Sequence, residues 1–488
     1  MNFQKIFRTV GKILVIESAF MFVAFVVGLG YEEYYDALWT CLSAAITFGI
    51  GFALMFLIKP KKRNLYARDG FLLVGLSWLA MSLCACMPYM LTGSIKNFFS
   101  AFFECSSGFT TTGGSVIKDV TELSHCVLLW RELTHWLGGM GILVFMLAVF
   151  PNAEGDTTYI FGAESTGYRS DKIVAKMRFT AIILYIIYLT FTILETCLLV
   201  VKMPLFDAVI HAMGTVSTGG FSSNAASVMG YGDPYVEIVV TVFMFLCSLN
   251  FTLYFMLMLG SVKEVFKNEE LRTYLVILAV SILVIALSLL NTYDNFATCL
   301  RHSSFQVLSF SSTTGFFSEN FTSWPTVSKA ILIFLMFIGG MGGSTAGGMK
   351  VSRACIMIKS AKADLTKVYR PNRVVSVKFG GKTLSATDTS NVRVFIALYF
   401  TVLIFSTLAV SLLGMMSKNP TTLGENASGV LSALSNVGPF FGNGTAYAGD
   451  FNCFNWAQKF VLSLDMLAGR LEIFPMLLVF MPGYWKYK

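Results

Sequence analysis

Charged residues are scarce in this chain of 488 amino acids: Asp, Glu, Lys and Arg make up 13% of it, whereas 55% of its residues are hydrophobic. Soluble domains carry about 25% charged residues, so this sequence has too little polar surface to coat a water-soluble globule. It also has no polar stretch large enough for a catalytic domain on a single membrane anchor. Function must therefore reside in membrane-spanning segments and in the short segments between them.

Patterns typical of metal centres and enzymes are also missing. The four His residues are scattered, and the ten Cys residues lie mostly in apolar segments without a CxxC motif. Such cysteines are typical of small core residues rather than of ligands or disulfides. The spans hold no Ser/His pair, paired Asp or HExxH motif, which argues against an intramembrane enzyme. A Walker motif is absent as well, so any nucleotide would bind a partner.

Apolar runs of about 17 to 25 residues, long enough to cross a bilayer, recur along the whole chain. The ten candidates occupy residues 11–30, 37–58, 70–91, 126–150, 177–201, 236–260, 273–291, 328–349, 393–414 and 456–481. An even number of crossings places both termini on one side, and 27 of the 36 Lys and Arg residues lie on that side. The positive-inside rule makes it cytoplasmic. The sequence thus predicts an all-α multi-pass membrane protein, whose net charge of +8 requires no nucleic acid.

Four outer gaps, those after spans three, five, seven and nine, share one pattern. Each contains an apolar stretch of about 8 to 13 residues, too short to cross, followed by a run rich in Ser, Thr and Gly. These stretches begin near Asn97, Phe206, Ser304 and Ala427. Each fits a re-entrant half-helix sheltered by protein or by a water-filled cavity. The period of about 100 residues indicates a fourfold internal repeat that excludes the first two spans.

The four polar runs predict an ion filter. Aligned on one glycine they read Thr111-Thr112-Gly113, Ser217-Thr218-Gly219, Thr313-Thr314-Gly315 and Asn436-Val437-Gly438. Four loops of this kind supply the backbone carbonyls that replace the hydration shell of K+ in potassium channels. Glycine permits the torsions that aim successive carbonyls inward. Ordinary loops between helices are the alternative, but four copies on the outer side favour the filter.

These features resemble the Trk/Ktr/HKT superfamily of potassium transporters, specifically its bacterial Trk-type membrane subunit. The resemblance covers nearly the whole chain and rests also on WLGGMGI at 136–142, GGMGGSTAGGMKV at 339–351 and AGRLEIFP at 468–475. It implies four degenerate M1-P-M2 repeats forming a pseudo-fourfold pore, plus two extra N-terminal helices. The implied divisions are 1–69 for the extra spans and 70–176, 177–271, 272–391 and 392–488 for the repeats.

The resemblance also implies how the protein works. The twelve filter residues would bind K+, the transported ion, through their backbone carbonyls, and a glycine at Gly113 favours K+ over Na+. The protein would be a homodimer in the cytoplasmic (inner) membrane, regulated by a cytoplasmic TrkA-like nucleotide-binding ring. The loop from Lys350 to Arg393, with ten Lys and Arg residues, and residues 152–178 would form the docking surface. Contact with anionic lipid is the alternative for the basic loop.

A glycine-rich segment near the end of the eighth span predicts a break in that helix. It contains Gly339, Gly340, Gly342, Gly343, Ser344, Thr345, Gly347 and Gly348. Each glycine costs a helix about 1 kcal/mol relative to alanine. Close packing of small residues in an intact helix is the alternative. The resemblance favours a broken segment that acts as a gate beneath the filter.

Several charged residues also require an explanation. An arginine deep in a span, such as Arg470, costs about 2.5 to 3.5 kcal/mol to insert. Either it pairs with another helix, or, as the resemblance implies, it lies in the pore below the filter. Arg131 and Glu132 are expected to anchor the outer interface, and Glu104 either adds negative potential at the mouth or hydrogen-bonds neighbouring backbone, as does Asp207. Two competing functions remain. One is an alternating-access transporter for an organic solute, which predicts inverted repeats, whereas these repeats run in parallel. The other is a secondary transporter with the same filter that is coupled to H+ or Na+.

Overall fold

The computed structural model describes residues 2–58, 67–141, 177–373, 375–415, 417, 420–442, 450–481 and 483. This part of the chain is almost entirely helical, with one short antiparallel hairpin of strands β1 (Lys378–Phe379) and β2 (Lys382–Thr383). Six of its helices are long and apolar enough to cross a membrane, or seven if one bent pair counts as a span. The prediction of an all-α multi-pass membrane protein is confirmed.

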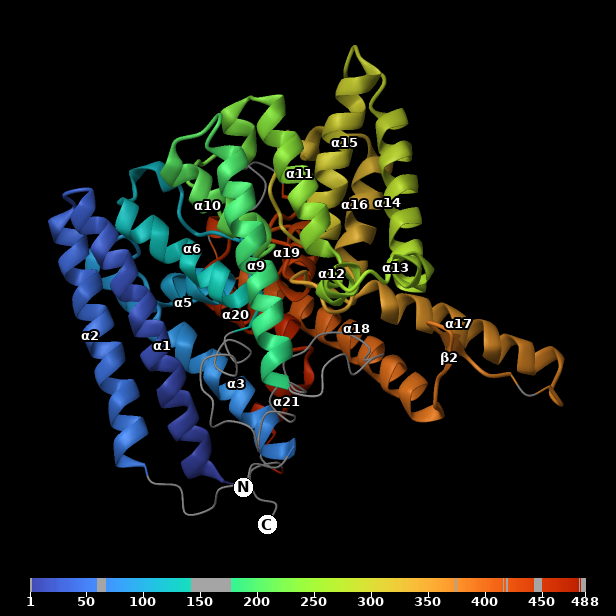
Figure 1. Cartoon of the computed structure of the whole chain (residues 1–488), viewed down its shortest axis with the longest axis horizontal. Coiled ribbons are helices and arrows are strands. Elements are labelled where there is room, and N and C mark those ends of the chain that lie inside the picture. Colours follow the sequence, from blue (N-terminus) through green and yellow to red (C-terminus); the bar gives the residue numbers. More distant parts are fainter. Residues whose placement is uncertain are drawn as a thin grey trace.

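Two long antiparallel helices stand at one edge of the molecule, α1 (Phe3–Gly30) and α2 (Tyr34–Leu57) (Figure 1). Their backbones approach closely where Gly11 faces Gly51, because a Cβ atom on Gly11 would lie 2.6 Å from the carbonyl oxygen of Gly51. Small residues allow such contacts between membrane helices. These are the two extra N-terminal helices that the sequence predicts.

Four M1-P-M2 repeats follow, each made of a long first helix, a shorter pore helix and a second helix. The first helices are α3 (Ala67–Cys84) continued by α4 (Cys86–Thr92), α9 (Met177–Leu199), α14 (Glu269–Ser288) and α18 (Ala386–Gly414). The pore helices are α5 (Phe98–Phe109), α10 (Leu205–Val216), α15 (Phe296–Ser311) and α19 (Leu423–Ser435). The second helices are α6 (His125–Gly139), α11 (Pro234–Ser248), α16 (Thr326–Ile338) and α20 (Trp456–Arg470). The predicted fold class is thereby confirmed.

The pore helices match the predicted half-helices, although two are longer than expected. Helix α15 begins at Phe296 rather than near Ser304, and α19 begins at Leu423. Polar caps set these starts: the Asn295 side chain accepts the N–H of Ala297, and Thr422 forms a capping box with Glu425. The apolar stretch alone therefore underestimates the helix, because the cap sets the start and the first turns include polar residues such as Arg301 and Glu425.

The second helices are shorter than predicted, and this corrects the expected spans 236–260, 328–349 and 456–481. Helix α11 bends by 89° into α12 (Phe251–Met258), where the Asn250 side chain caps the new helix. Helix α16 ends before Gly339, whose φ is +69°. Helix α20 ends at Arg470, and α21 (Phe474–Phe480) begins after a three-residue break in which Glu472 and Ile473 have positive φ. Residues 142–150 of the remaining predicted span lie outside the described residues.

A 3-10 turn precedes each second helix: η1 (Val120–Glu122), η3 (Ser227–Tyr231), η4 (Phe321–Ser323) and η5 (Phe451–Cys453). Asp119 caps the first of these turns, and hydrogen bonds from the hydroxyl and the amide of Thr121 lower the pKa of the Asp119 carboxyl. The repeats thus share these turns as well as their helices.

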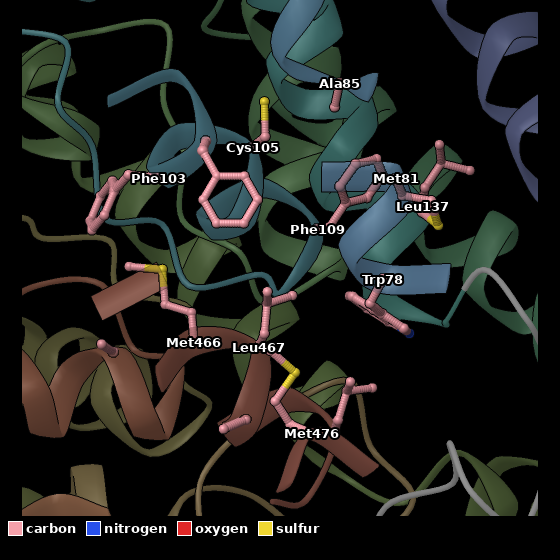
Figure 2. Close-up of a cluster of buried hydrophobic side chains, with 14 of the residues drawn as sticks. Trp78, Met81, Ala85, Phe103, Cys105, Phe109, Leu137, Met466, Leu467 and Met476 are labelled. Carbon is pink, nitrogen blue, oxygen red and sulfur yellow. The ribbon is translucent and has the colours of Figure 1, made fainter. Parts of the chain in front are cut away.

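The first and fourth repeats meet in a buried apolar cluster. Figure 2 shows Trp78 and Phe109 from the first repeat facing Met466, Leu467 and Met476 from the fourth. In the turn before α20, the N–H of Phe451 also donates to the carbonyl of Ser115 at 3.0 Å. The first repeat also contacts the second, the second contacts the third, and the third contacts the fourth. The contacts between the first and fourth repeats therefore close the four repeats into a ring.

Helix α17 (Val351–Tyr369), the β hairpin and the start of α18 form an arm that extends from the bundle at lower right in Figure 1. Arg393 of α18 holds the arm together, because its Nε donates to Ser360 Oγ at 2.9 Å and its guanidinium pairs with Asp364. Within the arm, α17 follows the glycine-rich residues of the third repeat directly in sequence. The arm is therefore joined to those residues.

Candidate ion-conduction site

The four filter loops share one backbone conformation. A residue with left-handed φ ends the pore-helix turn in every repeat: Thr111 (+54°), Thr218 (+56°) and Thr313 (+59°), each directly after the helix cap, and Asn436 (+56°), which is itself the cap. Two residues later stands a glycine with positive φ in every repeat: Gly113 (+78°), Gly220 (+78°), Gly315 (+81°) and Gly438 (+96°). Left-handed threonine is strained, and such strain gathers at functional sites. All four loops have this left-handed backbone conformation at the equivalent position.

This geometry corrects the predicted alignment of the second repeat, which is wrong by one residue. The residues equivalent to Thr111-Thr112-Gly113 are Thr218-Gly219-Gly220. Ser217 is instead the cap of α10, like Thr110 after α5. The repeat contains two consecutive glycines, so sequence alone could not decide which of them takes the positive φ. Hydrogen bonding agrees with the backbone angles, because the N–H of Gly219 bonds to the carbonyl five residues earlier, as does that of Thr112.

The four loops contact each other in a closed ring. A Cβ atom added to Gly113 would overlap the carbonyl oxygen of Gly219 in the second loop. The same relation links Gly220 to Thr314, Gly315 to Val437 and Gly438 to Thr112. Each glycine is therefore required twice, for its φ and for the space that its neighbour's carbonyl occupies. The ring order also places the first and third repeats diagonally opposite each other.

Asn436, where the other loops have threonine, has a structural role of its own. Its side-chain Nδ2 donates to Thr112 Oγ1 at 3.0 Å in the first loop and to the carbonyl of Met466 at 2.9 Å in α20. Asparagine tolerates the left-handed conformation better than most residues. The departure of the fourth loop from the Thr/Ser pattern thus adds a side-chain bond between two neighbouring loops.

Residues 339–350 form a folded, non-helical loop, here called the gate loop, so the predicted helix break is confirmed. Its neck is closed by three backbone bonds, in which Met349, Lys350 and Val351 donate to Phe337, Ile338 and Gly340 at 3.1, 2.8 and 3.1 Å. Since the segment is not helical, the alternative of small residues packing within an intact helix is wrong.

The gate loop lies directly against the filter. The N–H of Gly347 donates to Thr313 Oγ1 at 2.6 Å, and a Cβ atom on Gly347 would overlap the carbonyl oxygen of Ser435. On another side, Thr345 Oγ1 donates to the carbonyl of Cys247 at 3.2 Å, at the bend of the second repeat. Two filter loops and a broken helix therefore hold this segment in place.

Glu270, at the start of α14, also holds the gate loop. Its Oε1 accepts the N–H groups of Gly342 at 2.8 Å and of Ser352 at 3.0 Å, at either side of the loop neck. Sequence reasoning missed this residue, because a carboxylate at the edge of an apolar span is indistinguishable from an ordinary helix start. Glu270 and Gly342 are 72 residues apart in the sequence, so a local sequence pattern cannot reveal their contact.

Arg470 bridges two repeats beneath the filter. Its guanidinium donates to the carbonyl of Thr345 at 2.7 Å in the gate loop and to those of Gly138 and Gly139, each at 2.6 Å, at the end of α6. Those acceptors belong to the first and third repeats, which are diagonal in the ring. A side chain from the fourth repeat that reaches both must lie near the central axis.

The nearest acidic residues in sequence are engaged elsewhere as well. Asp465 accepts a hydrogen bond from Ser406 at 2.6 Å, and Glu472 pairs with Arg353 at 2.5 Å. The printed hydrogen bonds of Arg470 thus run to backbone carbonyls of the first and third repeats, as expected of a residue in the pore below the filter.

Arg131 and Glu132 do not anchor the outer interface, which corrects that expectation. Both are buried, at 3% and 1% exposure, in the interior of α6. Arg131 Nε lies 2.7 Å from Glu104 Oε1, and Glu104 accepts the N–H of Val116 at 2.9 Å, so hydrogen bonding to backbone is its role. Asp207 accepts a hydrogen bond from Ser223 at 2.5 Å.

A ring of four re-entrant loops, with a folded segment and an arginine beneath it, defines a membrane transport protein of the four-repeat M1-P-M2 class. The model of the TrkH family, described as cation transport proteins, matches residues 40–487. The chain belongs to this family. Its members are transporters, so the expectation that this protein is not an enzyme is confirmed.

Full-length relatives agree with this assignment. The Trk system potassium uptake proteins TrkH of Salmonella typhimurium and of Vibrio parahaemolyticus are 31% and 34% identical over 494 and 499 residues, covering 100% of this chain and of each relative. The solved structure titled as the potassium transporter TrkH from Vibrio parahaemolyticus superimposes with a TM-score of 0.87 at 31% identity, covering 100% of both chains. The resemblance stated from the motifs is thereby confirmed.

Proposed function

We propose that this chain conducts K+ inward across the cytoplasmic (inner) membrane, with both termini in the cytoplasm. The observation that carries the proposal is the ring in which the glycine of each filter loop lies against a carbonyl of the next. The binding residues, with the second repeat in its corrected register, are 111–113, 218–220, 313–315 and 436–438. Their backbone carbonyls replace the hydration shell of the ion. Relatives named for potassium uptake support K+ as the cargo.

The pore helices assist the filter electrostatically. Each of α5, α10, α15 and α19 ends at a filter loop, one or two residues before the left-handed position. A helix C-terminus carries about half a negative charge. Four such ends directed at one site favour a cation there and disfavour an anion.

The gate loop and Arg470 form the barrier in this proposal. A guanidinium cannot lose its proton in a protein, so its charge persists beneath the filter. At an effective dielectric constant of about 20, a unit charge about 6 Å from K+ opposes it by about 3 kcal/mol. That barrier slows passage roughly a hundredfold, since about 1.4 kcal/mol corresponds to tenfold. Conduction requires the loop and the arginine to move together, because they are hydrogen-bonded to each other.

The cytoplasmic arm supplies a docking surface for a TrkA-like nucleotide-binding regulatory ring. Seven basic side chains are exposed on it: Lys362, Lys367, Arg370, Arg373, Lys378, Lys382 and Arg393. Helix α17 begins at the gate loop, so force on the arm reaches the barrier without an intermediary. The second docking segment expected at 152–178 lies almost wholly outside the described residues. The proposal also includes the homodimer that the resemblance implies.

Coupling of K+ flux to H+ or Na+ through the same filter is the competing function. Fully buried carboxylates within the spans favour it, namely Glu17 in α1 and Glu195 in α9, because a carboxyl group in a membrane is a functional candidate. Both residues lie outside the filter loops. Proton coupling would require that they exchange protons with water during transport.

Reversal potentials of the purified protein in liposomes distinguish these functions. Under a K+ gradient alone, a passive conductor reverses at the K+ equilibrium potential, and imposed Na+ or pH gradients leave that potential unchanged. A shift of the reversal potential with pH, or a shift with Na+ larger than the measured K+/Na+ permeability ratio explains, would establish coupling. Absence of K+ current in folded protein, with and without a regulatory ring, would refute the proposal.

A further inference from the structure

A buried ion pair stands behind the filter loops of the first two repeats. Glu104 of pore helix α5 and Arg131 of second helix α6 are joined by a 2.7 Å contact between Oε1 and Nε. Their side chains are 0% and 3% exposed. Removal of two charges from water costs several kcal/mol per ion, which the attraction repays only with good geometry and further hydrogen bonds. The other bonds of both residues show what the pair does.

Glu104 binds the segment that leaves the first filter loop. Its carboxylate accepts the hydroxyl of Ser115 at 3.0 Å and the N–H of Val116 at 2.9 Å. These residues follow Gly113 by two and three positions. Glu104 therefore fixes the outgoing end of the loop that holds the carbonyl of Thr112.

Arg131 binds the corresponding segment of the second loop. Its Nη1 donates to the carbonyl of Ser222 at 3.2 Å, and its guanidinium carbon lies 3.4 Å from the ring centroid of Phe221. Phe221 directly follows Gly220. One ion pair thus connects the outgoing ends of two neighbouring filter loops, each within three residues of its glycine.

The equivalent positions in the other repeats contain no such pair. The position of Glu104, seven residues before the left-handed residue, is His211, Gln306 and Gly429 in repeats two to four. The position of Arg131, seven residues after the helix cap, is Val240, Leu332 and Leu462, all buried. The position of Ser115 is Ser222, Phe317 and Phe440.

The filter is therefore supported unequally around its ring. His211 continues the polar network in the second repeat, because its Nε2 lies 3.0 Å from Ser222 Oγ. The third and fourth repeats have the buried rings of Phe317 and Phe440 at the same place. The outgoing ends of these two loops are held by neutral hydrogen bonds, from Ser309 to the carbonyl of Phe316 and from the N–H of Phe441 to Ser428, whereas a charged pair joins the first two loops.

We infer that the Glu104–Arg131 pair is a specificity-determining element of the filter: it fixes the separation of the first two loops and so the distance between their carbonyls. A buried ion pair is often replaceable by apolar residues without loss of stability, so its presence points to position rather than to stability. A filter that discriminates K+ from Na+ depends on the number and placement of its carbonyls. The inference rests on the proposed function as a K+ conductor.

The chain itself offers the replacement that tests this inference. Repeat three has Gln306 and Leu332 at the two positions, so the double variant E104Q/R131L gives repeat one a pair that this fold already accommodates. It removes both charges together, whereas E104Q alone would leave a buried, unpaired arginine and destabilise the protein. We expect the double variant to insert and unfold like the wild type but to lose about tenfold in K+/Na+ permeability ratio, equivalent to about 1.4 kcal/mol of discrimination.

Two further variants complete the experiment. Gln306→Leu is the matched control, because the Gln306 amide has no hydrogen-bond partner in the described part of the chain; its ratio should equal that of the wild type. Phe221→Leu leaves both charges paired and removes only the ring beneath Arg131, so we expect a smaller loss of about threefold.

The measurement is the bi-ionic reversal potential of each purified protein in liposomes. An unchanged ratio in folded E104Q/R131L and in Phe221→Leu would overturn the inference, as would an equal loss in Gln306→Leu. Wild-type protein that does not prefer K+ would instead refute the proposed function. The two failures are thus distinguished by the wild-type trace alone.

Discussion

The hydroxyl oxygen of Thr313, in the third filter loop, accepts a 2.6 Å hydrogen bond from the backbone N–H of Gly347 in the gate loop. The threonines at the equivalent positions have no such contact: Thr218 donates to the carbonyl of Ser217, and Thr111 Oγ1 has no hydrogen-bond partner among the described residues. The part of the ring that faces the gate loop is therefore bonded to it directly.

Replacing this hydroxyl should favour the open state. Thr313→Val leaves the buried N–H of Gly347 unpaired when the gate loop is closed, which costs about 1 to 3 kcal/mol. We expect K+ flux into liposomes to rise roughly five- to a hundredfold, and Thr313→Ser to restore the wild-type flux. Thr111→Val and Thr218→Val are matched controls and should show much smaller changes. Equal increases in all three variants would show that the Thr313 bond has no special role.

The first filter glycine should determine ion preference. Gly113→Ser places a Cβ atom on the carbonyl oxygen of Gly219, so the neighbouring loop must move. We expect the Na+/K+ permeability ratio to increase about tenfold, since a carbonyl displaced by a fraction of an ångström no longer matches dehydrated K+.

A control separates this contact from backbone strain. Gly93 has a φ of +81°, close to the +78° of Gly113, but a Cβ atom there would meet nothing within 4 Å. Gly93→Ser therefore carries the same conformational cost without a neighbour to displace. Its permeability ratio should match that of the wild type, and an unchanged ratio in Gly113→Ser would contradict the role of Gly113 in discrimination.

Arg470→Ala should raise K+ flux and leave selectivity nearly intact. The substitution removes the charge beneath the filter and frees three carbonyls, two at the end of α6 and one in the gate loop. The expected increase is up to about a hundredfold, from a barrier of about 3 kcal/mol. Arg470→Lys keeps the charge and should stay near the wild-type rate. Lost flux in correctly folded Arg470→Ala would mean that the residue supports the conducting structure.

Shortening the gate loop should increase flux in the absence of a regulatory ring. Deletion of residues 343–346 removes Thr345, which bonds both Cys247 and Arg470, and keeps the neck bonds at 337–351. Tracer uptake by liposomes measures the effect, with membrane insertion and thermal unfolding as controls. If flux falls while the fold is retained, the segment belongs to the conducting path rather than to the barrier.

Local sequence patterns were sufficient to predict the repeats, the pore helices and the gate loop. Apolar stretches of half the bilayer length, each followed by a Ser/Thr/Gly run, have few structural explanations. Local patterns could not predict the register of the second filter loop, because Gly219 and Gly220 are equally free to adopt a positive φ. Contacts with the surrounding loops decide which of the two adopts it. The prediction of a fourfold filter survives this shift of one residue.

Other features depend on contacts between distant segments. The span 236–260 is mostly apolar and contains no proline or glycine except Gly260, yet it bends by 89° between Ser248 and Phe251. The bend exists because the gate loop bonds the exposed backbone there, including the carbonyl of Ser248. The Glu104–Arg131 pair likewise joins residues 27 positions apart. Propensity and periodicity describe single helices, whereas these features arise from packing between them.

The bonds of Arg470 also bear on how the protein is made. The ribosome synthesises residues 138, 139 and 345 long before residue 470. The carbonyl groups of those three residues therefore lack the Arg470 donor until the last repeat has been made. Water in the path beneath the filter can bond these carbonyls until that donor arrives. The first three repeats therefore cannot complete the closed structure beneath the filter during synthesis. Insertion of α20 is the step that seals the nascent pore.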